Sequence, residues 1–267
     1  MSVMLSHRFI QVAKAVGVHH AVRTLWKPFI AAGIDAPGPH GMRLQVPRDL
    51  NPAIYEQFWR GLYEQPETRL MRAHFHADHT IVDLGANLGY VGAFALREKL
   101  LPGGRLVCVE ANPDMHDCLA ENIAVRARAG FEDRQVDIIR AALVAGSSGG
   151  KAAFMKLPTL SSHVLNGESL HQGGEVICVD TVTMDALAAR YAPDGYSLIC
   201  DIEGGETALL ESPEALAGCR QMMVELHQPE LVQQGSSVDD AIRRFEDMGF
   251  ELRGRDHQSY AFARPAP

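Results

Sequence analysis

The sequence predicts an α/β protein with a doubly wound, mainly parallel sheet of seven strands. From about residue 79 onward, apolar runs of strand length alternate with helical patterns, and such alternation is typical of a parallel sheet covered by helices on both faces. The last two runs are close together and are expected to form a hairpin, which makes one edge strand antiparallel. We expect an N-terminal helical extension over residues 1–65 and one α/β domain over 66–267.

The N-terminal extension carries helical patterns of its own. Apolar residues at helical spacing over 6–31 predict one or two helices, and Pro28 should break or kink the second. Residues 33–41 are rich in Gly and Pro and are expected to be a loop. Asn51-Pro52 suits the start of another helix, which continues to Leu62. This extension could form a lid over a substrate pocket, or it could only cover a sheet edge or form a homodimer.

The seven expected strands are separated by five expected helices. The strands are 80–84, 105–110, 136–144, 196–201, 220–226, 249–253 and 258–263. The helices are 89–100, 113–128, 182–191, 205–211 and 238–248. Residues 145–180 interrupt the alternation with two extra strands, 151–155 and 175–179, around a loop rich in Ser, His, Asn and Gly. We interpret this segment as an insertion near the site and not as a second domain.

Composition and charge exclude several classes of protein. A hydrophobic fraction of 46% is ordinary for a chain that buries a core, and the formal net charge is −8 without a basic block, so a nucleic-acid partner is not expected. Five cysteines without a C-x-x-C pair suggest reduced thiols in the cytoplasm. Charged residues interrupt the apolar N-terminal runs, so we expect no signal peptide and no membrane association.

The most informative segment is a glycine-rich turn that follows the first strand of the alternation. Asp83 ends an apolar run, and Gly85, Asn87 and Gly89 follow at regular spacing before the helix that begins at Tyr90. The dinucleotide fingerprint would need glycine at positions 87 and 90, so a bound pyrophosphate is disfavoured. The pattern resembles motif I of class I S-adenosylmethionine (SAM) methyltransferases. The alternative is a purely structural turn in some other α/β protein.

The second strand ends in an acid that suits a ribose. Ligands of open α/β sheets bind outside the carboxyl ends of the strands, and Glu110 stands at such an end, followed by Ala-Asn-Pro. A carboxylate there could accept hydrogen bonds from both ribose hydroxyls, unless it is only a solvated acid. Asn112 suits an N-cap, with Pro113 at the first helical position. We assign Asn112 and Ala142, which lies in the third strand run, to the same cofactor-binding group.

Three carboxylates crowd the end of the fourth strand. Asp201, Glu203 and Glu206 lie within six residues that also contain two glycines, and such a concentration of like charge is costly without a function. It suits a general base, a cation site or a pocket for a cationic group. Glu206 could instead simply occupy the first turn of the next helix, where negative charge is favourable.

The fifth strand ends in Glu225 and His227, which alternation places on the same side. Adjacent parallel strands should bring both residues near Asp201. His227 could serve as a general base, or Asp201, Glu225 and His227 could hold a divalent cation such as Mg²⁺. The alternative is a histidine that only forms hydrogen bonds in the loop before Pro229.

Taken in order, these motifs resemble the FkbM-type family of SAM-dependent methyltransferases over roughly residues 66–253. The matching segments are Asp-Leu-Gly-Ala-Asn-Leu-Gly-Tyr at 83–90, Glu-Ala-Asn-Pro at 110–113, Val-Asp-Thr-Val-Thr-Met-Asp-Ala-Leu at 179–187, Asp-Ile-Glu-Gly-Gly-Glu at 201–206 and Glu-Leu-His at 225–227. The resemblance implies a Rossmann-like class I methyltransferase fold and methyl transfer from SAM, typically to a hydroxyl oxygen of a small molecule or sugar. Two departures are Gly205 in place of alanine and Cys200 where lysine is common.

The resulting assignment has three groups of residues. Asp201, Glu203 and His227 are expected to be catalytic, and Asp201, Glu225 and His227 form the candidate metal site. The residues expected to bind the cofactor are Asp83, Gly85, Asn87, Gly89, Tyr90, Glu110, Asn112 and Ala142. The remaining alternatives are an NAD(P)-dependent oxidoreductase and a SAM-binding protein without catalytic activity.

Other motifs carry less weight. His74, His76 and His79 could suggest a metal, but a surface or cap segment is the simpler interpretation. Ser161, Ser162 and His163 in the insertion could touch cofactor or substrate. The sequence contains neither a G-x-S-x-G elbow nor a phosphate-binding G-x-x-x-x-G-K-[ST] loop, which argues against an α/β-hydrolase and a P-loop NTPase.

Overall fold

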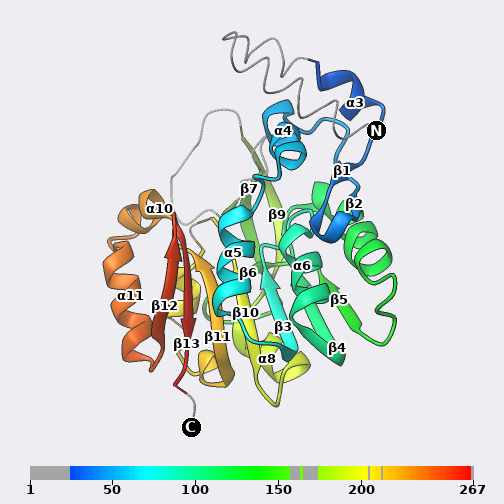
Figure 1. The fold of residues 1–267 in the computed structure, drawn as a ribbon. Coiled ribbons are helices and arrows are strands. Elements are labelled where there is room, and N and C mark those ends of the chain that lie inside the picture. Colours follow the sequence, from blue (N-terminus) through cyan, green and yellow to red (C-terminus); the bar gives the residue numbers. More distant parts are fainter. Residues whose placement is uncertain (1–24, 157–162, 165–173, 204, 212, 266–267) are drawn as a thin grey trace.

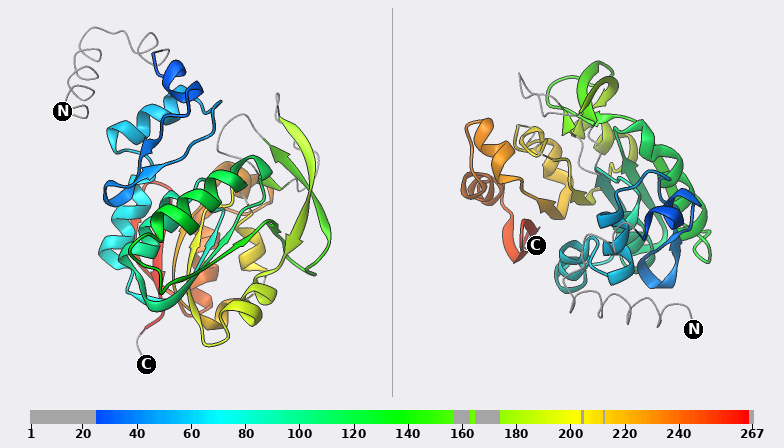
Figure 2. Two further views of the ribbon diagram at one scale, coloured as in Figure 1. Left: turned by 90° about the vertical axis from the view of Figure 1, so that its right-hand side faces the viewer. Right: turned by 90° about the horizontal axis from the view of Figure 1, so that it is seen from above.

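The computed structural model describes residues 25–156, 163–164, 174–203, 205–211 and 213–265. These residues form a seven-stranded main sheet, a four-stranded small sheet and a short two-stranded ribbon. Helices cover both faces of the main sheet, and the small sheet stands to one side of it (Figures 1 and 2). No helix in these ranges is both long enough and apolar enough to cross a membrane.

The main sheet confirms the doubly wound prediction. Its neighbours follow the order β12-β13-β11-β10-β3-β4-β5, in which β11, β10, β3, β4 and β5 are parallel and the β12–β13 hairpin is antiparallel. The strand order reverses between β3 and β10, and this reversal creates the crevice in which open α/β sheets bind ligands. The strands are β3 (Asp78–Leu84), β4 (Leu100–Val109), β5 (Gln135–Ile139), β10 (Tyr196–Cys200), β11 (Cys219–Glu225), β12 (Glu251–Asp256) and β13 (Ser259–Ala263).

Alternate residues of each central strand face opposite hydrophobic cores. Ile81 of β3 contributes to one core and Val82 to the other, as the period of two in a strand requires. The first core is covered by α4 (Pro52–Arg60), α5 (Gln65–His74), α6 (Tyr90–Glu98), η2 (Pro113–Met115), α7 (His116–Ala120) and η3 (Glu121–Ala127). The second is covered by α8 (Met184–Tyr191), α9 (Thr207–Leu210), η4 (Ala215–Gly218), α10 (Gln228–Gln233) and α11 (Val238–Asp247). Helices α5 and α10 were not predicted from the sequence.

The run predicted as a single strand over 136–144 is divided between the two sheets. Strand β5 ends at Ile139, Arg140 is exposed, and β6 (Ala142–Leu143) pairs with β9 of the small sheet. A run of apolar residues indicates a strand but does not say which sheet the strand joins. The small sheet has the order β6-β9-β7-β8, with β7 (Lys151–Lys156), β8 (His163–Val164) and β9 (Glu175–Val182), and it contains the two extra strands expected in the insertion.

The described part of the N-terminal extension packs directly on the first core. Helix α3 (Lys27–Ala31) has Pro28 in its first turn, where a missing amide costs nothing, so Pro28 does not break a helix there. Residues 6–24 of the expected helices lie outside the described residues. The expected loop contains β1 (Ala36–Pro37) and η1 (Pro39–Gly41), and β2 (Arg43–Leu44) follows it. Helix α4 starts at the Asn51 cap as predicted and ends earlier, at Gly61.

A buried amide ties this extension to the helix layer of the main sheet. The Asn122 side chain accepts a hydrogen bond from the Gln45 amide at 2.7 Å and donates to the Gln45 carbonyl at 2.9 Å. It also donates to the Leu88 carbonyl at 2.8 Å. Because Asn122 is fully buried, these bonds fix the segment that follows β2 against the glycine-rich turn.

Candidate active site

The glycine-rich turn after β3 and the acidic segment after β10 meet at the reversal in strand order. A cleft with about 600 Å³ of empty space opens there, lined by Gly85, Asn87, Glu110, Ala142, Asp201 and Glu203 among others. Phe154 of β7 also lines this cleft, so the small sheet supplies one of its walls. The structure therefore places six of the predicted cofactor and catalytic residues around one space at the carboxyl ends of the parallel strands.

Gly85 permits a close contact inside the protein and not only an approach to a ligand. Its φ is +77°, and a Cβ atom on it would lie 1.7 Å from the carbonyl oxygen of Asp201. The Asp201 amide also donates to the Leu84 carbonyl at 2.9 Å. The cofactor turn and the acidic segment therefore hold each other in place.

Two of the predicted cofactor residues have mainly structural contacts. Gly89 has a φ of +82°, and a Cβ atom on it would collide with the Ile123 side chain, so this glycine allows a helix to pack closely. The Asn112 side chain accepts a hydrogen bond from the Asp114 amide at 3.1 Å, which confirms the predicted N-cap. Neither residue is among those that line the cleft, and we describe both as supports of the site.

Glu110 is held by two backbone amides at the edge of the cleft. Its carboxylate accepts hydrogen bonds from the Asn87 amide at 2.8 Å and the Asn112 amide at 2.6 Å. Burial raises the pKa of Glu110, and these hydrogen bonds oppose the rise. A carboxylate has about four acceptor positions, so Glu110 can still accept the two hydroxyl groups of a ribose.

Asp83 lines a second cavity that adjoins the cleft. This cavity has about 340 Å³ of empty space and shares Gly85, Asn87 and Asp201 with the cleft; Tyr90 also lines it. Asp83 is 3% exposed, and its buried Oδ2 atom accepts no hydrogen bond from any described residue. Burial raises the pKa of Asp83 to about 7, with the Glu110 charge adding to the effect. A cationic group in this cavity would compensate the buried carboxylate.

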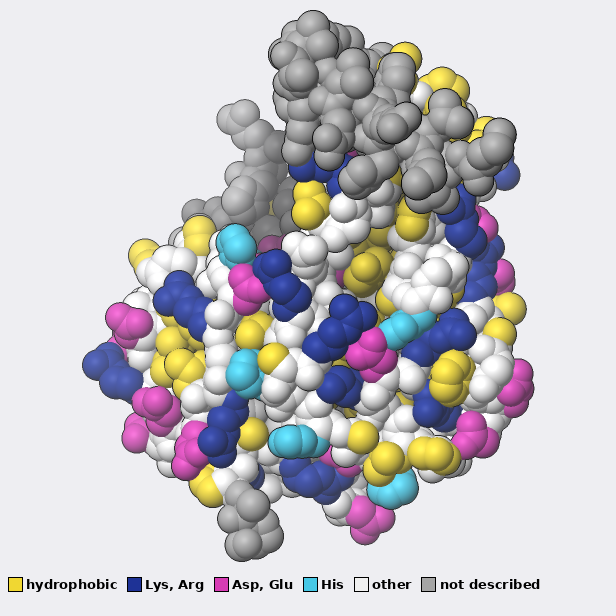
Figure 3. Space-filling view, in the orientation of Figure 1, with side chains coloured by type: hydrophobic (Ala, Val, Ile, Leu, Met, Phe, Trp, Pro, Cys, Tyr) yellow, Lys and Arg dark blue, Asp and Glu magenta, His cyan; other side chains and the backbone are white. Residues whose placement is uncertain are grey.

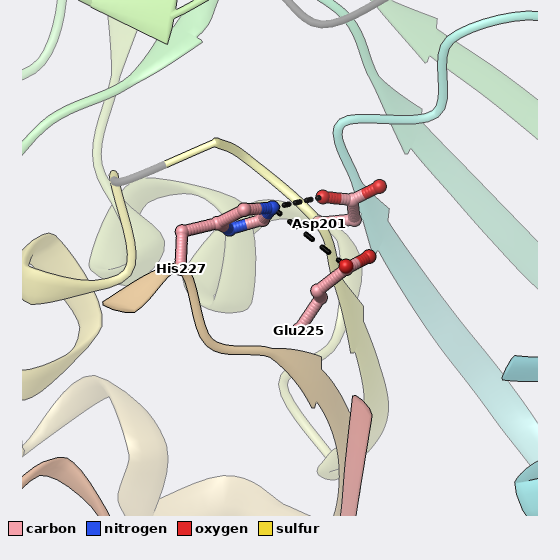
Figure 4. A group of neighbouring side chains, drawn as sticks. All are labelled: Asp201, Glu225 and His227. Carbon is pink, nitrogen blue, oxygen red and sulfur yellow. Dashed lines mark ion pairs between the residues drawn. The ribbon is translucent and has the colours of Figure 1, made fainter. Parts of the chain in front are cut away.

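Asp201, Glu225 and His227 converge as the alternation of the strands predicts (Figure 4). His227 Nε2 lies 3.7 Å from Asp201 Oδ1 and 3.8 Å from Glu225 Oε1. Glu203 Oε2 is nearer, at 3.3 Å from the same nitrogen. One potential ligand atom from each of Asp201, Glu225 and His227 lies within 4.8 Å of the other two. All three predicted catalytic residues and all three predicted metal ligands therefore share one site.

Glu206 orients the His227 ring, a role that sequence reasoning left open. Glu206 is fully buried, and its carboxylate lies 2.7 Å from His227 Nδ1. The acid therefore fixes which nitrogen faces the other carboxylates. Burial alone would lower the pKa of His227, but the hydrogen bond and charge of Glu206 and the charges of Asp201 and Glu203 raise it to about 10. The surrounding acids therefore favour the protonated form of the His227 ring.

Glu64 and Glu67 add two acids that the sequence analysis did not identify. Both line the second cavity, at the start of α5. Burial, followed by the charges of Glu67 and Glu225, raises the pKa of Glu64 well above its usual value. The pKa of Asp201 is also raised well above its usual value, mainly by burial and then by the charges of Glu225 and Glu64. An amphipathic helix over 65–74 was the sequence signal that would have placed these acids.

The remaining candidates do not join the site. His74 lies against Gly254, and the His76 backbone exchanges hydrogen bonds with the Gln221 side chain, which fits the predicted cap segment. Within the part of the chain that the structure describes, these histidines form no group of three or more potential metal ligands. Ser161 and Ser162 lie outside the described residues, as does the side chain of His163.

Comparison with known proteins gives one family match. A model described as the methyltransferase FkbM domain matches residues 83–252. No curated protein matches the chain.

Several solved structures are distantly similar. A precorrin-6y C5,15-methyltransferase from Geobacter metallireducens shares 15% identity over 74% of this chain and 86% of its own, with a TM-score of 0.36. Aeropyrum pernix fibrillarin, solved with natively bound S-adenosyl-L-methionine, shares 13% sequence identity over 70% of this chain and 66% of its own, with a TM-score of 0.37. A protein of the NADB-Rossmann superfamily from Streptococcus agalactiae shares 12% sequence identity over 73% of this chain and 65% of its own, with a TM-score of 0.40.

Proposed function

The chain belongs to the FkbM methyltransferase family, and on this premise we propose that it methylates a hydroxyl oxygen of a small molecule or sugar with SAM as the methyl donor. The observation that carries the proposal is the contact between the two halves of the site. The cofactor turn at Gly85 packs on the backbone of Asp201, and Asp201 belongs to the acid–histidine cluster. A group that accepts a proton therefore stands beside the place where the cofactor would be held.

The cleft and the second cavity fit the chemical groups of SAM. Glu110 would hold the ribose, while Ala142 and Phe154 would line the space beside the adenine. The second cavity contains the uncompensated Asp83 carboxylate, which suits the ammonium group at the amino-acid end. When bound, SAM supplies a methyl group on a sulfonium sulfur, and that sulfur keeps the electron pair of the broken bond.

The residues of the cluster would prepare the acceptor. A hydroxyl group is a poor nucleophile until it loses its proton, and a positioned side chain can accept this proton. Burial and the neighbouring acids raise the pKa of Asp201, which makes its carboxylate a stronger base than an ordinary one, so we assign Asp201 as the proton acceptor, with His227 nearby to compensate its charge. The second route left open by the sequence, in which a divalent cation activates the hydroxyl group, uses the same residues.

A small acceptor is more consistent with the surface than a nucleic acid. Acidic, basic and apolar side chains are mixed over the described part of the face in Figure 3. The whole chain has a formal net charge of −8, which opposes binding to phosphate backbones.

The test is a turnover assay with SAM against a panel of hydroxylated small molecules, with S-adenosylhomocysteine as the measured product. Asp201→Asn should reduce turnover by about 100-fold or more, the usual contribution of a general base. Glu246→Gln, which makes the same charge change on the exposed side of α11, should leave it unchanged.

Two outcomes would favour the alternatives. Calorimetry that detects NADH but neither SAM nor S-adenosylhomocysteine would indicate an oxidoreductase. Binding of SAM without any turnover on the panel, equal in the wild-type and the Asp201→Asn protein, would indicate a protein that only binds the cofactor.

A further inference from the structure

We propose that Asp201, Glu225 and His227 bind a divalent first-row transition-metal ion, of which Mn²⁺ is the representative, and that Glu206 positions the histidine ligand. Metal binding follows from the positions of these side chains. The role of the ion in activating the acceptor hydroxyl group rests on the proposed function.

The spacing of the cluster is the first argument. Nε2 of His227 lies 3.3, 3.7 and 3.8 Å from carboxylate oxygens of Glu203, Asp201 and Glu225. These distances exceed the 2.7–3.2 Å typical of N–H···O hydrogen bonds, in which an imidazolium and a carboxylate would normally pair. With bonds of about 2.1 Å, neighbouring ligands of one ion stand about 3.0 Å apart in octahedral and about 3.4 Å apart in tetrahedral coordination. The Asp201 and Glu225 oxygens would therefore have to approach Nε2 by only a few tenths of an ångström to share an ion.

The second argument is a buried carboxylate oxygen that accepts no hydrogen bond. Asp201 Oδ1 is inaccessible to solvent and accepts no hydrogen bond from any described residue. It nevertheless faces His227 Nε2 and belongs to the ligand group that includes Glu225 Oε1. A buried carboxylate oxygen is costly unless it is paired or bound to a metal, and an ion between these three side chains would compensate it.

The third argument is the Glu206 carboxylate, which lies behind the His227 ring. His227 is 7% exposed, and Nδ1 is engaged by the buried Glu206 carboxylate at 2.7 Å. A carboxylate bonded to the far ring nitrogen is the usual arrangement behind a metal-bound histidine, because it fixes the tautomer and aims the other nitrogen at the metal. The ion would bind at Nε2, while the Nδ1 side of the ring stays engaged by Glu206.

The surrounding charge explains why an ion is needed. Among the described residues, the ion pairs of Asp201, Glu203 and Glu225 all involve His227. Two further acids, Glu64 and Glu67, lie at the start of α5 and line a cavity that Asp201 also lines. A divalent ion would bring two positive charges to the centre of these carboxyl groups.

The ligand types select the ion. Two carboxylates and one imidazole favour Mn²⁺ or a later first-row ion over Mg²⁺, which prefers oxygen ligands and retains several waters. Three protein ligands leave positions for other donors, and a bound acceptor hydroxyl group could fill one of them. On the ion its proton would be lost more easily, and the Glu203 carboxylate is close enough to accept it.

The experiment is a titration of the full-length protein with Mn²⁺ at neutral pH, followed by the electron paramagnetic resonance signal of the free ion. The wild-type protein should bind one Mn²⁺ per chain, and excess Mg²⁺ should compete poorly. Glu225→Gln and Asp201→Asn should each weaken binding about tenfold or more, and Glu206→Gln about 10- to 100-fold, as expected for a group behind a metal ligand. Glu246→Gln is the matched control and should bind like the wild type.

Calorimetry with S-adenosylhomocysteine on the same samples separates the two proposals. Glu225 does not line the cofactor cleft, so Glu225→Gln should still bind this product and thereby show that it is folded. S-adenosylhomocysteine binding by a wild-type protein that takes up no stoichiometric Mn²⁺ overturns the metal site alone. Mn²⁺ binding that survives both Glu225→Gln and Asp201→Asn overturns it as well. Mn²⁺ binding without any binding of SAM or S-adenosylhomocysteine overturns the proposed function and leaves the metal site standing.

Discussion

Replacing Gly85 by alanine should damage both halves of the active site with a single methyl group. The left-handed φ of +77° costs an L-residue about 1–2 kcal/mol. The new Cβ would lie 1.7 Å from the Asp201 carbonyl oxygen, whereas real contacts are not closer than 3.0 Å, so the backbones must separate by about 1.3 Å. Overpacking of this kind costs about 1–3 kcal/mol. The total loss of unfolding free energy should be about 2–5 kcal/mol.

The assay pairs urea denaturation with calorimetry of S-adenosylhomocysteine binding. Gly130→Ala is the matched control, because Gly130 has a φ of +83° and nothing within 4 Å of the added Cβ. It should lose only the conformational term, about 1–2 kcal/mol, and keep its affinity. Gly85→Ala should lose more stability and bind about tenfold more weakly or worse, since the turn that holds Asn87 against Glu110 must move. Equal stability losses in the two variants, with cofactor affinity retained in both, would refute the contact as the reason for this glycine.

Three further substitutions test other parts of the structure. Glu110→Gln places an amide where two backbone N–H groups donate, and calorimetry should show about tenfold weaker binding of S-adenosylhomocysteine, at unchanged circular dichroism. Phe154→Ala removes a wall of the cleft and should weaken the same binding; because Phe154 is buried against Ala142 and Val179, urea denaturation should also show a loss of about 3–5 kcal/mol. For Asp78, burial would raise the pKa, but hydrogen bonds from Arg220 and Ser197 outweigh it and lower the pKa; this stabilisation is present above about pH 4 and is lost as the pH falls through the lowered value. Asp78→Asn should therefore cost about 1–3 kcal/mol at neutral pH, and urea denaturation should show the difference shrinking towards about pH 3.

The sheet and the convergence of the catalytic residues were predictable because they depend on local periodicity. A period of two places Glu225 and His227 on one side of β11, and parallel neighbours bring the ends of β10 and β11 together. The sequence therefore identified the cluster before any coordinates were known. It also identified the cofactor turn, since the spacing of Gly85, Asn87 and Gly89 is a local property.

What the sequence did not reveal depends on contacts between distant segments. Glu206 has the same local pattern whether it begins a helix or supports His227, and only its contact with the His227 ring, which comes from a distant part of the chain, distinguishes the two. Glu64 lies in a segment assigned to the extension, so its approach to Asp201 could not be foreseen. The division of 136–144 between two sheets likewise depends on β9, which lies more than thirty residues further along the chain.

The hydrogen bonds of Asn122 limit how chimaeras of this protein can be made. The family match begins at residue 83, which invites exchanging everything before it between relatives to change acceptor choice. However, Asn122 lies inside the matched part and satisfies both polar groups of the Gln45 backbone. A transplanted N-terminal segment would keep its orientation only if its new host offers an asparagine at the equivalent position. The unit that can be exchanged between relatives is thus not a continuous stretch of chain. A chimaera must match Asn122 to the N-terminal segment whose backbone it binds.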